Sequence, residues 1–403
     1  MSFKHIFVVN VFYTPYSYGG ATIVAEEVSV ELAKNHDFMI TAISTICRDD
    51  IAPYTVLKVE RYGISNYLIN LPKVRNYSEV YNNPQVDEIV ARLIDALSPD
   101  LMHLHCIQDI GAGIISAAKR RNLPVVLSIH DFWWICERQF MIKPSGVYCA
   151  QNPVKFENCK GCVTNITNAR TRYDYLLEQA AMVDILTYPS NFAKDLCAKS
   201  GLNARENIVW QNGVTKPNAD FFKQQEKRRQ IDPRISFGYV GGPSHIKGWP
   251  IIRTAFTHLK QDNFAGYLVD GSLDGTWWSG VDISTMKGDW KIHPRYNQAT
   301  MDAFYSKIDV LLFMSQWKET YGLTIREAIS RGIHVIQTDS GGTIEHEAAI
   351  MQEMFEIGDK ATKLTPQLEK ILGSSHKHPK STSVRSYSDQ AKEFSKIIEP
   401  LIL

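Results

Sequence analysis

The chain lacks an excess of charge of either sign. Its 44 lysines and arginines nearly balance 43 aspartates and glutamates, which gives a formal net charge of +1 at pH 7. This balance argues against a dedicated nucleic-acid-binding protein, which carries a strong basic excess. No apolar run reaches the length of about 18 residues that a membrane-spanning helix needs. The N-terminus has a short apolar run without a small-residue cleavage site, so we expect a cytoplasmic protein without a signal peptide.

Cysteine is also scarce, with seven residues in 403. So few cysteines in a chain of this length argue against a secreted disulfide scaffold, and the odd number leaves at least one unpaired. Four of the seven nevertheless gather in segment 136–162, which ends in the C-x2-C spacing of a metal-binding hairpin. They are Cys136, Cys149, Cys159 and Cys162. Four thiolates would complete a tetrahedral structural zinc site, whereas an iron–sulfur cluster or four reduced cysteines are the alternatives.

Short apolar runs that alternate with helix-like segments dominate the remaining pattern. This alternation predicts an α/β protein with parallel, doubly wound sheets. A length of 403 residues suits two domains of about 200 residues each. The expected strands of the first series are 6–9, 39–44, 101–105, 125–129, 184–188 and 208–210, and those of the second are 235–240, 266–270, 309–314 and 334–338.

The polar, proline-bounded segment 216–234 is interpreted as a link between the two series. We therefore expect an N-terminal domain over 1–215 and a C-terminal domain over 216–385. A last helix, within 386–403, is expected to pack back on the N-terminal domain. Open α/β sheets bind ligands at the carboxyl ends of their strands, so the chemistry is expected in a central cleft that the two domains face.

The stretch 318–342 places two carboxylates, Glu319 and Glu327, around a predicted helix start at Leu323. Unpaired N–H groups at a helix start bind phosphate, and Gly322 allows the backbone to approach it. Glu327 lies on the same helix face as Leu323, roughly 6 Å further along the axis, where a carboxylate can accept bonds from ribose hydroxyls. Glu319, before the turn, can reach the group beyond a diphosphate. The segment thus suits ribose, diphosphate and sugar in that order.

This stretch resembles the E-x7-E signature of retaining glycosyltransferases of family 4, which have the GT-B fold of two facing Rossmann-like domains. The resemblance rests on the two glutamates together with the flanking strand, turn, helix, strand and double glycine, because two glutamates eight apart also occur by chance. Members that build bacterial surface polysaccharides carry a similar cysteine-containing loop. The matching residues of the stretch are Glu319, Thr320, Tyr321, Gly322, Leu323, Thr324, Glu327, Ala328, Gly332, Gly341 and Gly342.

Other segments match the family at its donor site and near the transferred sugar. The glycine loop with Gly241 and Gly242 precedes Lys247, which by resemblance clamps the donor diphosphate. Gly242 stands where the family usually has arginine, so one positive charge is absent. The Gly19–Gly20 pair matches the N-terminal diphosphate and acceptor-side loop. In each case the alternative is an ordinary surface turn.

His130 follows the strand predicted at 125–129, where the family has a histidine that contacts the transferred sugar. A lone histidine is more often a structural hydrogen-bonding residue, and this alternative stays open. Asp131 would orient His130 or cap the next segment.

The resemblance implies metal-independent transfer of a sugar, of hexosyltransferase type, from a nucleotide diphosphate sugar to a hydroxyl of a glycan or lipid-linked acceptor in bacterial polysaccharide biosynthesis. The chain has no Asp-x-Asp motif to hold a catalytic metal ion. The expected catalytic residues are Glu319, His130 and Lys247, and the expected donor-binding residues are Gly19, Gly20, Gly241, Gly242, Lys247, Tyr321, Gly322, Leu323, Thr324 and Glu327.

The N-terminal domain would take the acceptor and the C-terminal domain the nucleotide sugar. A lipid-linked acceptor would bring the protein to the inner face of the membrane as a peripheral protein. Two other functions stay open: a sugar-nucleotide 2-epimerase of the same architecture, and a non-catalytic subunit that binds sugar nucleotides. The epimerase usually lacks the E-x7-E string, and a non-catalytic subunit would be expected to lose Glu319 or Lys247.

Overall fold

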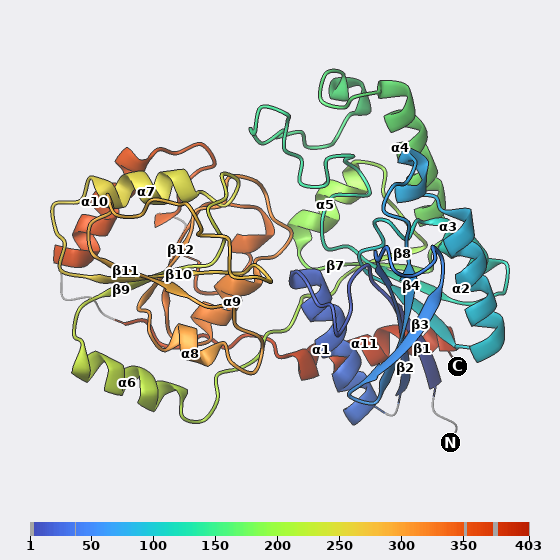
Figure 1. The fold of residues 1–403 in the computed structure, drawn as a ribbon, viewed down its shortest axis with the longest axis horizontal. Helices are drawn as coiled ribbons and strands as arrows, with labels where there is room; N and C mark the ends of the chain where they lie inside the picture. Colours follow the sequence, from blue (N-terminus) through green and yellow to red (C-terminus); the bar gives the residue numbers. More distant parts are fainter. Residues whose placement is uncertain (1–3, 37, 350–352, 374–377, 403) are drawn as a thin grey trace. The chain divides into compact units, whose positions relative to one another are not determined.

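The computed structural model describes residues 4–36, 38–349, 353–373 and 378–402, and the chain folds into two compact units (Figure 1). Unit 1 comprises residues 1–141, 149–213 and 385–403, and unit 2 comprises residues 142–148 and 214–384. The sequence places the domain boundaries at 215 and 385, whereas the units change over after residues 213 and 384. Residues 142–148 of the cysteine loop group with unit 2, which the sequence analysis does not anticipate.

Unit 1 is built on a sheet with the strand order β3-β4-β2-β1-β5-β6-β7-β8. Its neighbouring strands pair in parallel except for β3 and β4, which form an antiparallel hairpin at one edge. The central strands are mostly apolar and are buried at nearly every position, as is usual for strands covered on both faces. The bounds are β1 Lys4–Val9, β2 Phe38–Ile46, β3 Val56–Arg61, β4 Ile64–Asn70, β5 Leu101–Leu104, β6 Val125–Ser128, β7 Ile185–Tyr188 and β8 Glu206–Val209.

Helices pack around this sheet, and the C-terminal helix α11 lies against α1 (Figure 1). Gln390 of α11 accepts a hydrogen bond from the Gly213 amide at 2.7 Å, and its carbonyl accepts one from the Trp210 indole at 3.1 Å. These bonds tie the end of the chain to the segment that follows β8. The helices of unit 1 are α1 Gly20–Asn35, α2 Pro84–Leu97, α3 Gly113–Lys119, α4 Ile166–Ala181, α5 Asn191–Lys199 and α11 Tyr387–Ile402, with short 3-10 turns at Tyr77–Val80 and Phe156–Cys159.

Unit 2 contains a parallel sheet with the order β11-β10-β9-β12-β13. The strands are β9 Ser236–Tyr239, β10 Ala265–Val269, β11 Asp289–His293, β12 Val310–Phe313 and β13 His334–Gln337. The helices are α6 Phe221–Ile231, α7 Trp249–Thr257, α8 Asp302–Tyr305, α9 Leu323–Ile329 and α10 Ala361–Gly373, with a 3-10 turn at Gly342–Ile344.

Two apolar layers cover the faces of the unit 2 sheet. Along β12, Val310 and Leu312 pack into the layer shared with α7 and α10, whereas Leu311 packs into the layer shared with α6 and α8. This alternation is the two-residue period of a strand, and it explains why β12 is apolar at every position.

Segment 216–234 is not a plain linker, and this part of the sequence interpretation is wrong. Helix α6 occupies most of it and belongs to unit 2. Phe221 is fully buried, and Arg228 and Arg229 both reach the carboxylate of Asp309 just before β12, at 2.6 Å and 2.9 Å. The run of charge that suggests an exposed link is therefore partly a buried ion-pair network.

The predicted fold class is confirmed: two units of α/β type, each built on a mainly parallel Rossmann-like sheet. Both sheets have a switch point, where successive connections run to opposite sides. It lies between β1 and β5 in unit 1 and between β9 and β12 in unit 2. Ligands bind at such points, beyond the carboxyl ends of the strands. The central cleft stays a prediction.

In the part of the chain that the structure describes, no helix combines the length and the apolar character that crossing a membrane requires.

We expect Phe394→Ala to destabilise unit 1. Phe394 is fully buried, and its ring lies 4.3 Å from that of His103 and 4.9 Å from that of Trp210, measured between centroids. Removing a buried phenylalanine costs about 3–5 kcal/mol. Denaturant unfolding followed by tryptophan fluorescence measures the loss. Lys392→Ala, an exposed change on the same helix, is the control, and equal stability of the two variants would contradict the packing of α11 against unit 1.

Candidate active site

An ion pair between Lys247 and Glu319 forms the centre of the candidate site in unit 2. Lys247 Nζ lies 2.8 Å from Glu319 Oε1, although the two residues are 72 apart in sequence. The Ser315 hydroxyl donates a second hydrogen bond to the same oxygen at 2.6 Å. The glutamate side chain is 12% exposed and the lysine side chain 32% exposed. Glu319 is thus largely buried, and Lys247 and Ser315 hold its carboxylate in a defined position.

The backbone around Glu319 is fixed by the loop that follows β13. The Glu319 amide donates to the carbonyl of Ser340 at 2.8 Å, and the Gly342 amide donates to the carbonyl of Glu319 at 2.9 Å. A parallel bridge joins Glu319 to Gly341. The double glycine of the sequence motif therefore pairs with the first glutamate of the same motif.

The turn before α9 is held from inside by Arg326. Arg326 is 2% exposed, and its guanidinium carbon lies 4.0 Å from the centre of the Tyr321 ring. It donates to the carbonyl of Tyr321 in this turn and to three carbonyls of the segment that follows β13, those of Gly342, Thr343 and Glu345. Gly322 caps α9 in the left-handed region with φ 84°, which favours glycine.

Glu327, the second carboxylate of the motif, lies on the buried side of α9. It is 3% exposed, and Tyr305 OH donates a hydrogen bond to its Oε2 at 2.7 Å. Burial raises the pKa of Glu327, while the Tyr305 bond and the charge of Arg331 act in the opposite direction. Arg331 is itself paired with Asp302 at 2.6 Å. Tyr305 also contacts the carbonyl of Thr324 at 3.4 Å, so it supports the first turn of α9.

The packing of the glycine loop after β9 explains why residue 242 is glycine and not the arginine of the family. Gly242 has φ 62°, and a Cβ there would lie 2.6 Å from the ring of Trp277. The same ring would meet a Cβ at Gly271 at 2.7 Å. The indole of Trp277 therefore occupies the space at the position where the family carries a guanidinium. Gly241 is equally confined, since a Cβ would lie 2.7 Å from Tyr239 OH and 3.0 Å from Lys247 Cβ.

Gly19 and Gly20 lie at the start of α1 in unit 1. Gly19 is exposed and has φ 84°, and no heavy atom lies within 4 Å of a Cβ built on it. The glycine is therefore required by the backbone conformation and not by crowding.

His130 follows β6 and contacts a second histidine, His105, which follows β5. His130 Nε2 and His105 Nδ1 are 2.8 Å apart. Burial lowers the pKa of His130 to about 4, and burial lowers that of His105 well below its ordinary value. His130 is partly exposed, whereas His105 is 2% exposed.

Asp131 caps the turn after β6. Its carboxylate accepts hydrogen bonds from the Trp133 amide at 2.8 Å, from Gln139 at 2.6 Å and from Gln108 at 2.9 Å. Burial nevertheless raises its pKa. These bonds favour the capping role among the two that the sequence leaves open.

The four clustered cysteines lie in unit 1 and are partly exposed. Gln151 Nε2 lies 3.4 Å from Cys149 Sγ and 3.9 Å from Cys159 Sγ, and burial raises the pKa of Cys136 to about 11. Among the residues that the structure describes, no group of three or more His, Cys, Asp or Glu side chains is arranged to hold a metal ion. The zinc site stays a prediction, which one equivalent of zinc in purified protein would support and its absence would contradict.

The structure thus brings together several residues that the sequence nominates, and each of these contacts lies within one unit. Lys247 and Glu319 meet directly, and the motif from Tyr321 to Glu327 forms one turn and helix beside them. Sequence reasoning missed Tyr305, Arg326, Trp277 and His105. Only His105 carried a usable signal, because it stands at the carboxyl end of a predicted strand as His130 does.

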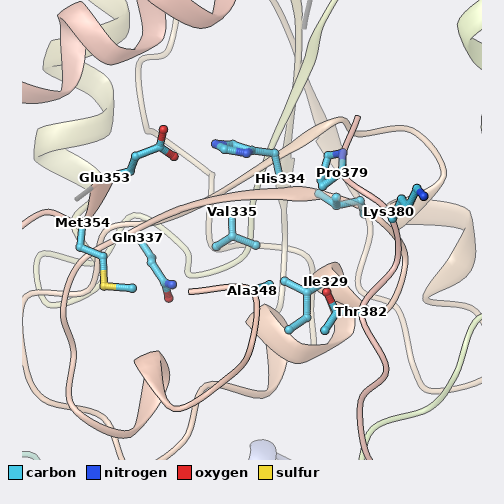
Figure 2. Close-up of a pocket in the computed structure, with 11 residues that line it drawn as sticks. Ile329, His334, Val335, Gln337, Ala348, Glu353, Met354, Pro379, Lys380 and Thr382 are labelled. Atoms are coloured by element: carbon cyan, nitrogen blue, oxygen red, sulfur yellow. The ribbon is translucent and has the colours of Figure 1, made fainter. Parts of the chain in front are cut away.

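A separate small cavity of about 80 Å³ lies along the edge strand β13 (Figure 2). Ile329, Val335, Gln337 and Lys380 are among its lining residues. No residue nominated for catalysis or donor binding lines it, so this cavity is distinct from the candidate site.

Comparison with known proteins gives a family and a set of relatives. Residues 18–216 match the family model described as Glycosyltransferase Family 4. An uncharacterized 42.6 kDa protein in the cps region of Klebsiella pneumoniae is 22% identical over 375 residues, which cover 88% of this chain and 90% of that protein.

Solved structures share the fold along nearly the whole chain. Sucrose-phosphate synthase from Thermosynechococcus elongatus matches with a TM-score of 0.67 and 14% identity, covering 99% of this chain and 96% of that one. An α,α-trehalose-phosphate synthase from Burkholderia xenovorans matches with a TM-score of 0.66 and 11% identity over 98% of this chain and 100% of that one. HepE from Anabaena, solved with UDP and glucose, matches with a TM-score of 0.64 and 14% identity, covering 98% of this chain and 99% of that one.

We expect Glu327→Gln to stabilise the protein at neutral pH. Because burial raises the pKa of Glu327, the folded chain binds a proton there more tightly than the unfolded chain does. The contribution of this group to the free energy of unfolding is fully present below the unfolded pKa of about 4.3. It is lost as the pH rises through the raised pKa of the folded state. Glutamine removes that loss and can still accept the Tyr305 bond.

Thermal melts of Glu327→Gln and wild type measure the effect. The variant should melt at least about 2 °C higher near pH 7.5, and its advantage should shrink towards about pH 4.5. Glu226→Gln, an exposed change in α6, is the control and should show no such trend. A Glu327→Gln advantage that is independent of pH would contradict ionisation of the buried carboxyl as its cause.

Proposed function

Because residues 18–216 place the chain in Glycosyltransferase Family 4 and its two units match GT-B structures, we propose that it transfers a sugar from a nucleotide diphosphate sugar to a hydroxyl group of an acceptor. The observation that carries the proposal is the Lys247–Glu319 pair, beyond the carboxyl ends of the adjacent strands β9 and β12. A cation and a carboxylate at a switch point suit a donor that has a dianionic diphosphate at one end and a sugar at the other.

The first chemical requirement is a counter-charge for the leaving group. Breaking the bond between the anomeric carbon and the phosphate oxygen places negative charge on the diphosphate and positive charge on the sugar ring. Lys247 is the cation for the diphosphate, in a site where preorganised charge is effective. In the free protein Glu319 holds the ammonium at 2.8 Å. Donor binding would give this ammonium a second, more highly charged partner.

Glu319 is then the residue that meets the sugar. Among the described residues, its side-chain hydrogen bonds from Lys247 and Ser315 both go to Oε1. Oε2 is left to accept a hydroxyl of the donor sugar and to offset charge that develops on the ring. Because Ser315 and the Gly341–Gly342 loop fix its position, the carboxylate does not need to reorganise during the reaction.

Glu327 suits the ribose of the nucleotide. Tyr305 occupies Oε2 of this buried carboxylate, and Oε1 can accept from a ribose hydroxyl. A buried carboxylate that gains such bonds is better satisfied with the ligand than without it. The raised pKa of Glu327 in the free protein is the physical reason why a ligand that hydrogen-bonds the ionised form would bind well here.

The finer features follow from the family resemblance. We propose retention of configuration, a metal-independent reaction and a hexose donor, with His130 near the transferred sugar and the leaving phosphate accepting the acceptor proton. HepE was solved with UDP and glucose, which supports a nucleotide sugar as donor. The relative from a cps region supports an acceptor that is a glycan or lipid-linked precursor of a surface polysaccharide. Such an acceptor favours cytoplasmic action at the membrane face.

A panel of nucleotide diphosphate sugars in a thermal-shift assay, followed by an acceptor screen with the donor that stabilises the protein, tests the proposal. Stabilisation by one donor and release of its nucleoside diphosphate only with an acceptor would support a transferase. Conversion of the donor to its epimer without acceptor would support the epimerase. Donor binding without turnover would support a non-catalytic subunit.

We expect Lys247→Ala and Glu319→Ala each to lower kcat by about 10²–10³-fold, which is typical for the loss of one preorganised charge. Because the residues form a pair, the double variant should lose much less than the product of the single losses. Steady-state kinetics on all three variants measures this. Lys291→Ala, exposed on β11 in the same unit, is the matched control. Wild-type turnover in either single variant would refute the assignment.

A further inference from the structure

Two histidines from adjacent strands of unit 1 share one hydrogen bond. His105 follows β5 and His130 lies two residues beyond β6, and these strands pair in parallel. His105 Nδ1 and His130 Nε2 are 2.8 Å apart, and the rings are nearly parallel at 19° with centroids 5.1 Å apart. The sequence nominates His130 alone, so the role of His105 arises from the structure.

The identity of the two nitrogen atoms restricts the tautomers. Burial lowers the pKa of both rings, so both are neutral near pH 7, and each carries a single N–H. If His130 donates from Nε2, then His105 Nδ1 is the unprotonated acceptor and His105 carries its hydrogen on Nε2. If His105 donates from Nδ1, then His130 must carry its hydrogen on Nδ1. The two rings therefore have the same tautomer in either case.

His105 is buried and packed against a third histidine. It is 2% exposed, and its ring centroid lies 4.1 Å from that of His103. His103 Nε2 is in turn 2.8 Å from Ser128 Oγ, and Phe394 of α11 stacks on His103. His130 is partly exposed at the end of its strand. The packing around His105 therefore restricts the orientation of its ring.

We propose that His105 is a positioning residue that selects the tautomer and ring orientation of His130. The selection decides whether His130 Nδ1 meets a sugar hydroxyl as a donor or as an acceptor. The effect on catalysis rests on the proposed transfer reaction, in which His130 lies near the transferred sugar. The coupling of the two tautomers does not depend on that function.

Histidine-selective ¹⁵N labelling and long-range ¹H–¹⁵N spectra near about pH 7.5 test the coupling, because the two tautomers have distinct ¹⁵N shifts. Signals are assigned with His105→Asn and His130→Asn. We expect His105 and His130 to show the same tautomer, each in a single form. Different tautomers on the two rings would overturn the inference, as would averaged shifts for His130 in the wild type.

Kinetics of three variants tests the role. Phenylalanine at position 105 fills the space but cannot hydrogen-bond to His130. His105→Phe should therefore lower kcat by about 10–100-fold, the size of effect seen when a hydrogen-bond partner that orients a metal-binding histidine is removed. Donor affinity in the thermal-shift assay should change little. Asparagine places an amide near the position of Nδ1, so His105→Asn should restore most of the lost kcat. Ser128→Ala is the matched control, because it removes the bond of the neighbouring His103 and leaves the pair intact.

The outcomes separate the two proposals. If the wild type transfers no sugar from any donor, the proposed function fails, while the spectra still decide the coupling. If the wild type is active and His105→Phe retains both its kcat and the single tautomer of His130, the inference fails and the proposed function stands. A loss in Ser128→Ala equal to that in His105→Phe would also overturn it, since the effect would then be general packing.

Discussion

The pairing of β9 with β12 is the constraint on which the candidate site of unit 2 depends. Tyr239 pairs with Leu312 in a parallel register, so both strands end at the same edge of the sheet. The chain leaves β9 towards β10 and leaves β12 towards β13, on opposite sides, which leaves space beyond the ends of β9 and β12. Lys247 follows one strand and Glu319 the other, and only this register brings them to 2.8 Å across 72 residues. A shift of one strand against the other would separate the pair.

This arrangement has a stability cost that the surrounding residues offset. Glu327 is a buried carboxylate with a raised pKa, and Gly242 and Gly322 have positive φ. Arg326 compensates by donating to the carbonyl of Tyr321 in the turn before α9 and to those of Gly342 and Thr343 after β13. Its charge is spread over carbonyl dipoles, and it lies against an aromatic ring. The turn is therefore rigid while its two carboxylates retain oxygen atoms for a ligand, a combination typical of sites prepared for binding.

Local patterns in the sequence predict part of this structure and cannot predict the rest. The buried central strands are predictable because they are continuous apolar runs. The edge strands β3 and β11 escape prediction, since partly exposed edge strands carry polar residues. Helix α6 resembles a linker in the sequence because Asp309, the partner of its arginines, lies about 80 residues away.

The same distinction applies to the site residues. Glu319, Glu327 and Lys247 belong to spaced motifs, which a single sequence displays. Tyr305 and Trp277 act through contacts with residues remote in the chain, Glu327 and Gly242, and no spacing rule indicates them. The glycine at 242 illustrates the limit well. The sequence shows that a charge is missing, whereas only the structure shows that an indole fills the space.

The two units use one principle with different chemistry. In each, side chains that follow adjacent parallel strands meet, as His105 and His130 do after β5 and β6. The pair in unit 2 is charged and its lysine is about one-third exposed, so it can exchange a partner for an anionic ligand. The pair in unit 1 is neutral and one member is buried, so it has no charge to exchange. What a neutral pair can transmit is the position of a hydrogen atom and the orientation of a ring, and for a group that contacts a sugar hydroxyl these two properties determine the interaction.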